Sequence, residues 1–133
     1  MMSFNNGSIS IWIDEQQVLH FVWESFATSK QYREGWTKAL TLANEKKINK
    51  WLIDQRESGT IMPKDLRWAN EEWYPKATKL LGEQSKIAVL PPKSAFGELS
   101  VRKAIEQLEA KRKEPLKLKY FSDNSEAVEW LFV

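Results

Sequence analysis

The chain has 133 residues, enough for one domain with a hydrophobic core that needs neither disulfides nor a structural metal. Its 42% hydrophobic and 29% charged residues are typical of a soluble globular protein. A net charge of +2 excludes a protein-wide electrostatic attraction to nucleic acid or membranes. The sequence has no cysteine, which excludes disulfides, thiolate catalysis, zinc-thiolate sites and iron-sulfur clusters.

No apolar run approaches the roughly 20 residues that a membrane-spanning helix needs. The N-terminus also lacks the basic start and apolar stretch of a signal peptide. We therefore expect a cytoplasmic protein without a membrane span, folded as a single domain over residues 1–133.

The first elements predicted are two strands and a helix. Residues 9–13 alternate apolar and polar side chains, residues 18–23 form a denser β-branched and aromatic run, and together they predict a hairpin. Thr28 or Ser29 can then cap a helix. Its apolar residues recur at helical spacing on one face: Tyr32, Trp36, Ala39, Leu40 and Ala43.

The middle of the chain predicts a buried strand followed by a second helix. Trp51 to Asp54 is a short apolar run that ends at an acid and opens into a polar Ser-Gly loop. The helix begins at Pro63 and ends at Gly82, and Pro75 inside it should kink or divide it. Its apolar face carries Leu66, Ala69, Trp73, Ala77, Leu80 and Leu81.

The remaining pattern predicts two more strands and two more helices. Residues 86–90 form a strand before Pro91-Pro92, and Leu116–Phe121 forms the last strand. Between them a third helix should turn Val101, Ala104, Ile105 and Leu108 inward, and Asp123 caps a final helix that carries Ala127, Trp130 and Leu131. The predicted order is ββαβαβαβα, an α/β fold whose mostly parallel sheet has an N-terminal hairpin and helices packed on it.

The sequence offers little catalytic chemistry. His20 is the only histidine and lies inside a predicted strand, so neither a His-rich metal site nor a classical Ser-His-acid arrangement is supported. No G-x-S-x-G elbow, Walker loop or G-x-G-x-x-G motif is present. The pair Glu71-Glu72 is typical of a solvated helix face. We therefore predict no catalytic residue, no metal and no cofactor.

The loop after the strand 51–54 is the leading candidate for a functional surface, because ligands of open α/β folds bind at the carboxyl ends of strands. An ionised Asp54 at the end of a buried strand should accept hydrogen bonds from the loop amides or pair with Arg56. Ser58 and Gly59 follow it in the loop.

Trp68 does not fit the apolar stripe of its helix. At 100° per residue it lies about 200° from Leu66, on the face opposite Trp73. One interpretation is a partner-binding residue beside Arg67, because Trp and Arg dominate interface hot spots. The other is that Pro75 reorients the segment and Trp68 covers the sheet edge.

These features together resemble the STAS-like domain family, which is related to anti-sigma factor antagonists and similar in topology to CRAL-TRIO lipid-transfer domains. The resemblance is carried by the strand order, the Leu-Ile-Asp strand with its Ser-Gly loop, Asp65-Leu66-Arg67-Trp68, and the ending from Phe121 to Leu131. It implies that residues 51–54 are the third strand of the sheet.

In the antagonist branch, a serine after the third strand, commonly in an Asp-Ser-Ser-Gly motif, is phosphorylated to switch partner binding. Ser58-Gly59 is the nearest match here. Glu57 stands in place of the first serine, and three residues, Thr60 to Met62, precede Pro63. The resemblance thus implies a candidate switch at Ser58, where about two added negative charges would change binding.

The leading hypothesis is a non-enzymatic protein-interaction or regulatory module. Its candidate partner-binding residues are Asp54, Arg56, Gly59, Arg67 and Trp68, with Ser58 as the candidate switch, and an exposed Trp surface would also suit a homodimer.

The alternative is a carrier of a small molecule or lipid in an apolar, Trp-lined pocket between the sheet and the second helix. An enzyme ranks third. Nucleic-acid binding ranks last and is not expected, because the basic residues Lys111, Arg112, Lys113, Lys117 and Lys119 are typical of a solvated helix end and strand edge.

Overall fold

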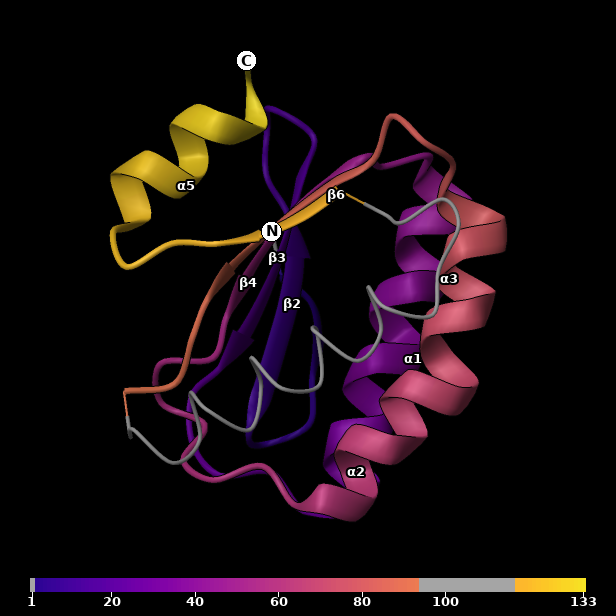
Figure 1. Cartoon of the computed structure of the whole chain (residues 1–133), viewed down its shortest axis with the longest axis vertical. Coiled ribbons are helices and arrows are strands. Elements are labelled where there is room, and N and C mark those ends of the chain that lie inside the picture. Colours follow the sequence, from indigo (N-terminus) through magenta and orange to yellow (C-terminus); the bar gives the residue numbers. More distant parts are fainter. Residues whose placement is uncertain (1, 94–116) are drawn as a thin grey trace.

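The computed structural model describes residues 2–93 and 117–133, and a mixed sheet with helices on both faces organises them (Figure 1). Strands β2 (Ile9–Ile13) and β3 (Val18–Trp23) are antiparallel, and β3, β4 (Lys50–Asp54), β5 (Lys86–Leu90) and β6 (Lys117–Tyr120) run parallel. This confirms the predicted α/β class and the mostly parallel sheet. The strands lie side by side in chain order: β1 (Met2–Asn5), β2 (Ile9–Ile13), β3 (Val18–Trp23), β4 (Lys50–Asp54), β5 (Lys86–Leu90) and β6 (Lys117–Tyr120).

The structure adds one strand to the predicted order. β1 pairs antiparallel with β2 at the edge of the sheet, with an irregular register between Met2 and Phe4. The strand that ends at Asp54 is therefore the fourth of the chain, not the third as the resemblance implied. The predicted third helix, with Val101 to Leu108, lies outside the described residues.

Helices cover the two faces of the sheet unequally. On one face lie α1 (Ser29–Lys46) and a long helical segment made of α2 (Pro63–Trp68), η1 (Ala69–Trp73) and α3 (Tyr74–Leu81). The other face carries α5 (Asn124–Leu131), which packs on β4 and β5 (Figure 1). None of the described helices is long and apolar enough to cross a bilayer.

Helix α1 begins and packs as its sequence dictates. The Thr28 hydroxyl accepts a hydrogen bond from the Gln31 amide while the Gln31 side chain accepts one from the Thr28 amide, which forms a capping box. Gly35 lets the helix approach the sheet closely, because a Cβ there would lie 2.8 Å from Cδ1 of Ile9. The helix ends where Lys47 adopts a left-handed conformation with φ of 56°.

Pro75 divides the second helical segment, as predicted. Because proline offers no amide hydrogen and its ring collides with the carbonyl four residues back, the α-helical ladder cannot continue through it. The chain forms the π-helical turn η1 instead, and α3 begins at Tyr74. A π-turn holds about one residue more than an α-turn, so Trp68 and Trp73, five residues apart, come nearer to one face than the α-helical spacing predicts.

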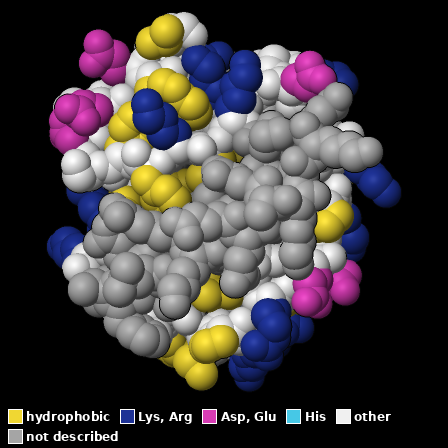
Figure 2. Space-filling view, viewed as in Figure 1, with side chains coloured by type: hydrophobic (Ala, Val, Ile, Leu, Met, Phe, Trp, Pro, Cys, Tyr) yellow, Lys and Arg dark blue, Asp and Glu magenta, His cyan; other side chains and the backbone are white. Residues whose placement is uncertain are grey.

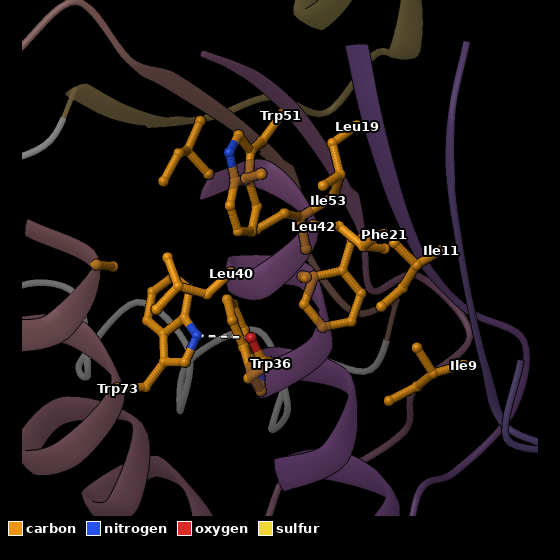
Figure 3. Packing of buried hydrophobic residues seen from close by; sticks show 14 of the residues in the cluster. Ile9, Ile11, Leu19, Phe21, Trp36, Leu40, Leu42, Trp51, Ile53 and Trp73 are labelled. Atoms are coloured by element: carbon orange, nitrogen blue, oxygen red, sulfur yellow. Dashed lines mark hydrogen bonds between the residues drawn. The ribbon is translucent and has the colours of Figure 1, made fainter. Parts of the chain in front are cut away.

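Aromatic side chains fill the larger core, between the sheet and α1 (Figure 3). The Trp73 indole donates a 2.7 Å hydrogen bond to the backbone carbonyl of Trp36, and the two rings meet at an angle of 64° with centroids 4.6 Å apart. Trp51 meets Trp73 edge-on at 5.9 Å. Packing in the core therefore explains the presence of these three tryptophans. Their burial agrees with the buried positions predicted for them from the sequence.

The smaller core lies under α5. Ala127 and Leu131 pack on Val18, Leu52 and Leu90. Asp123 caps the helix by accepting a hydrogen bond from the Ser125 amide, as its sequence predicted. At the other end, the Lys86 ammonium donates to the backbone carbonyls of Trp130 and Val133 at 3.1 and 2.8 Å and holds the helix end against the sheet.

Candidate functional site

The carboxyl ends of the parallel strands β3, β4 and β5 form a rim at one end of the sheet. Residues 24–28 leave β3 there, and residues 55–62 leave β4. The Gln55 amide donates to the carbonyl of Leu90 at 2.9 Å, and the Lys93 amide donates to the carbonyl of Arg56 at 3.3 Å. These bonds fix the loop after β4 to the chain that leaves β5.

Asp54 and Arg56 form a bidentate ion pair on this rim. The guanidinium donates from Nε and Nη2 to the two carboxylate oxygens at 3.0 and 2.8 Å, and the Arg56 amide also donates to Oδ1. The hydrogen bond to Asp54 and its negative charge raise the pKa of Arg56 above its ordinary value. Asp54 therefore accepts from both the loop amide and the arginine, and it fixes the first turn of the loop.

Ser58 lies inside this loop, not on its surface. Its side chain is 2% exposed, its hydroxyl donates to the carbonyl of Gly59 at 3.0 Å, and its amide donates to the carbonyl of Gln55. Gly59 is exposed and has a φ of 67°, a conformation that favours glycine. A modifying enzyme would reach the Ser58 hydroxyl only after the loop opens.

Asp65, to which the sequence analysis assigned no role of its own, lines the same small hollow as Ser58. It is buried and accepts a hydrogen bond from the Ser29 hydroxyl at 3.0 Å, with Nε of Arg33 3.7 Å from its other oxygen. From sequence, an acidic residue so close to the start of a helix is predicted to be an exposed residue of the first turn. Its burial comes from α1, which is distant in the chain.

Trp68 is half-buried, and Arg67 beside it is exposed. The Trp68 ring meets Tyr32 edge-on at 6.4 Å, and the guanidinium of Arg33 lies 5.4 Å from its centroid. The ring also lines a surface groove of about 590 Å³ between α1 and the η1–α3 segment, together with the exposed Leu80. Arg33 thus lies close to both Asp65 and Trp68, and Asp65 lines the same small hollow as Ser58.

The sequence analysis did not identify two exposed apolar side chains on the rim. Phe26 is 55% exposed and Met62 is 44% exposed, and both line a hollow of about 10 Å³ that Ser58 and Asp65 also line. Figure 2 shows hydrophobic side chains at the lower end of the molecule, with Lys and Arg side chains close by. Single apolar residues inside loops carry no periodicity, so the sequence gives no signal that separates exposed from buried ones.

A second concave feature lies between the sheet and the helices that cover it. The described residues of β4, β5 and β6 and of the helices α1, α2 and η1 line an almost wholly apolar cavity of about 60 Å³. It lies where the carrier hypothesis placed a pocket, between the sheet and the second helix. Its volume is well below the roughly 300 to 1,000 Å³ of ordinary ligand pockets, so an acyl chain would not fit without movement of the walls.

The only histidine lies in β3, and its side chain is held within the β2–β3 hairpin. His20 Nε2 lies 2.8 Å from the Asp14 carboxylate, and its ring stacks on Trp12 with centroids 4.9 Å apart. Burial raises the pKa of Asp14, but hydrogen bonds from His20 and from the amides of Val18 and Gln16 outweigh that effect, so the pKa is lowered. These contacts stabilise the hairpin.

Metal and polyanion sites find no support in the part of the chain that the structure describes. Among residues 2–93 and 117–133 no three His, Cys, Asp or Glu side chains gather in a group that could hold a metal ion. Lys117 and Lys119 are exposed on the edge strand β6, where lysines hinder pairing with another chain. Lys111, Arg112 and Lys113 lie outside the described residues.

Comparison with known proteins identifies the fold. No family model matches the chain, and no curated protein sequence matches it significantly. The crystal structure of an uncharacterised DUF3478-family protein with a SpoIIAA-like fold, from Shewanella loihica PV-4, superposes with a TM-score of 0.60. The match covers 98% of this chain and 99% of that protein at 22% identity. The fold is STAS-like. At this identity the STAS-like match establishes architecture alone, and the predicted resemblance is confirmed at that level.

Proposed function

We propose that this STAS-like protein is a non-enzymatic interaction module that binds a protein partner through the rim at the ends of β3 and β4. The observation that carries the proposal is the pair Phe26 and Met62, two large apolar side chains that are exposed and line the same small hollow. Exposed apolar side chains that gather at one place are typical of interaction sites. The anchored Asp54–Arg56 pair holds the loop, so binding would cost little ordering entropy.

Arg56, Arg67 and Trp68 extend this surface with residue types that dominate interface hot spots. Trp68 is half-buried and already packs on Tyr32, so it offers a rigid ring edge at the boundary of the surface. The chemistry near the rim favours binding over catalysis, because the His20 side chain pairs with Asp14 inside the β2–β3 hairpin.

The proposal is tested by capture of partners from the native organism with the wild-type protein and matched variants. Phe26→Ser and Met62→Ser should each reduce the captured partner at least fivefold, since exposed anchors contribute on the order of 1–2 kcal/mol to an interface. The control Phe132→Ser removes a comparably exposed apolar side chain, at 46%, from the end of α5, on the other face of the sheet. Equal losses of captured partner in all three variants, or no loss in the first two, would reject the rim as the binding surface.

A phosphorylation switch at Ser58 is the finer part of this proposal. A phosphoryl group would add about two negative charges to a hydroxyl that is now buried against Gly59, so the loop would have to open. Because Ser58 shares its hollow with Phe26 and Met62, that opening would disturb the binding surface. Intact-mass spectrometry of protein isolated under several growth conditions should show an 80-dalton adduct that Ser58→Ala removes, and a mass that never changes would contradict the switch.

A carrier function is the second candidate, and the apolar cavity is the observation that favours it. The volume of about 60 Å³ restricts the cargo to a small molecule in the present conformation. Native mass spectrometry of the protein isolated from its own organism is the test. A bound lipid would show that the walls open, and a ligand-free mass throughout would reject a carrier of tightly held cargo.

A further inference from the structure

Three lysines stand in a row at the amino ends of the parallel strands. Lys50, Lys86 and Lys117 are the first residues of β4, β5 and β6, and the register of the sheet pairs Lys50 with Lys86 and Lys86 with Lys117. Register partners in a parallel sheet point to the same face, and neighbouring strands lie about 4.8 Å apart. The row therefore crosses three adjacent strands at the end of the sheet opposite the rim.

The row lies on the face of the sheet that carries α5 (Figure 1). Nζ of Lys50 lies 5.4 Å from the ring centroid of Phe132, at the end of α5. Nζ of Lys86 lies 5.3 Å from the centroid of the Trp130 ring and donates to the carbonyls of Trp130 and Val133. An ammonium group has three donors, so one donor of Lys86 remains unused by the described residues.

Such a row of like charges is costly. Like charges directly opposite one another on neighbouring strands destabilise a sheet. Among the described residues, no side-chain carboxylate forms an ion pair with any of the three ammonium groups, and a terminal carboxylate at Val133 would balance only one of the three charges. Edge protection explains Lys117, but β4 and β5 are interior strands, so it explains neither Lys50 nor Lys86. Charges of one sign gathered in this way attract ions of the opposite sign, so the row favours an anion.

A surface hollow of about 280 Å³ lies beside the row. Lys50 and Lys86 line it, together with Asn49, Gln84 and residues 131–133 at the end of α5. The amides of Asn49 and Gln84 offer N–H donors as well as acceptors. No acidic side chain from the part of the chain that the structure describes lines this hollow. The hollow thus combines two positive charges, two amides and the apolar end of a helix.

These groups define the chemistry of the ligand. Ammonium groups only donate hydrogen bonds, so the ligand must accept them and carry negative charge. A phosphate monoester carries about 1.5 to 2 negative charges at pH 7 and three strong acceptor oxygens, and lysine binds phosphate as a point charge. The flexible stems of the three lysines can converge on one such group. The hollow is just below the roughly 300 to 1,000 Å³ of ordinary ligand pockets, so it suits a single phosphate group and not the repeated phosphates of a nucleic-acid chain.

We propose that Lys50, Lys86 and Lys117 form a binding site for a single phosphate monoester group, with Asn49 and Gln84 as hydrogen-bonding neighbours. The group belongs either to a soluble phosphate compound or to a lipid headgroup, and both present the same charge and the same oxygens. The site lies at the other end of the sheet from the rim and does not depend on the protein-interaction role.

The first test is titration of the full-length protein with inorganic phosphate, followed by the backbone amide signals in ¹H–¹⁵N NMR spectra, with potassium chloride at matched ionic strength as the control. The signals of Lys50, Gln84 and Lys86 should shift and saturate with a dissociation constant on the order of millimolar, because so small a ligand has little surface to bury. Signals of the rim, such as that of Gly59, should not follow the titration. Absence of a saturable shift, or the same shifts with chloride, would overturn the proposal.

Matched charge variants separate this site from a general attraction to anions. Lys50→Gln and Lys117→Gln should each weaken phosphate binding at least about fivefold, because each removes one of the three charges. Lys64→Gln removes the same charge from an exposed position on α2, on the other face of the sheet, and should leave the dissociation constant within about twofold. Loss of a like charge from the row should not lower the melting temperature without phosphate, so weaker binding would report the site and not unfolding. Equal effects of all three variants on binding would contradict the site.

Vesicles identify the source of the phosphate. Sedimentation with phosphatidylcholine vesicles that contain phosphatidic acid, but not with phosphatidylcholine alone, and its loss in Lys50→Gln would assign the group to a lipid headgroup. Saturable binding of inorganic phosphate without such sedimentation would assign it to a soluble phosphate compound.

Discussion

Gly35→Ala tests how closely α1 packs on the sheet. The added Cβ would lie 2.8 Å from Cδ1 of Ile9 and 3.2 Å from Cε1 of Phe21, both fully buried. Alanine gains about 1 kcal/mol over glycine in a helix interior. Overpacking a core costs about 1–3 kcal/mol, and the buried Ile9 methyl has little room to move. We expect a net loss of about 1 kcal/mol in the free energy of unfolding, or roughly 4 °C in melting temperature.

The assay is urea unfolding followed by tryptophan fluorescence, with Ile9→Val as the partner in a double-mutant cycle. Ile9→Val removes the atom closest to the new methyl and alone should cost about 1 kcal/mol. The double variant should lose at least about 0.5 kcal/mol less than the sum of the single losses, because the two changes share one contact. A Gly35→Ala protein at least as stable as wild type, or strictly additive losses, would refute this account of the packing.

Two further predictions concern the hairpin and the π-turn. The pKa of Asp14 is lowered in the folded protein. The contribution of Asp14 to stability is therefore present above its unfolded pKa, near 3.8, and is lost as the pH falls through the lower folded pKa. In an acid unfolding series, Asp14→Asn should lose less stability than wild type below pH 4, and parallel curves would contradict this. Trp73→Phe removes the 2.7 Å bond to the Trp36 carbonyl and should cost about 2–3 kcal/mol in denaturant unfolding, and a loss below about 0.5 kcal/mol would show that η1 does not depend on this bond.

Periodicity predicted the elements that have a buried face. The hairpin of β2 and β3, the helix α1 and the strand that ends at Asp54 follow the patterns of their own residues. β1 was missed because Met2 to Asn5 is short and lacks strong alternation. Met2–Asn5 forms a strand because β2 supplies backbone hydrogen-bond partners, and the sequence of the segment alone does not reveal those partners.

The candidate site was predictable only in part. The Asp54–Arg56 pair followed from the cost of leaving an ionised acid unpaired at the end of a buried strand. The burial of Ser58 was not predictable, because a Ser-Gly turn fits an exposed loop equally well. Phe26 and Met62 were missed for a related reason: whether an isolated loop residue is exposed depends on neighbours that are distant in the chain.

The central claim, that the rim binds a protein partner, is tested most directly by a photo-crosslinking amino acid at position 62 of the protein in its own cells. The same amino acid at position 132, at the end of α5, is the matched control, because both native side chains are exposed and α5 covers the other face of the sheet. The proposal predicts a discrete crosslinked protein from position 62 that is absent from position 132 and is lost when Phe26→Ser is added. No crosslink at position 62, or the same products from both positions, would contradict it.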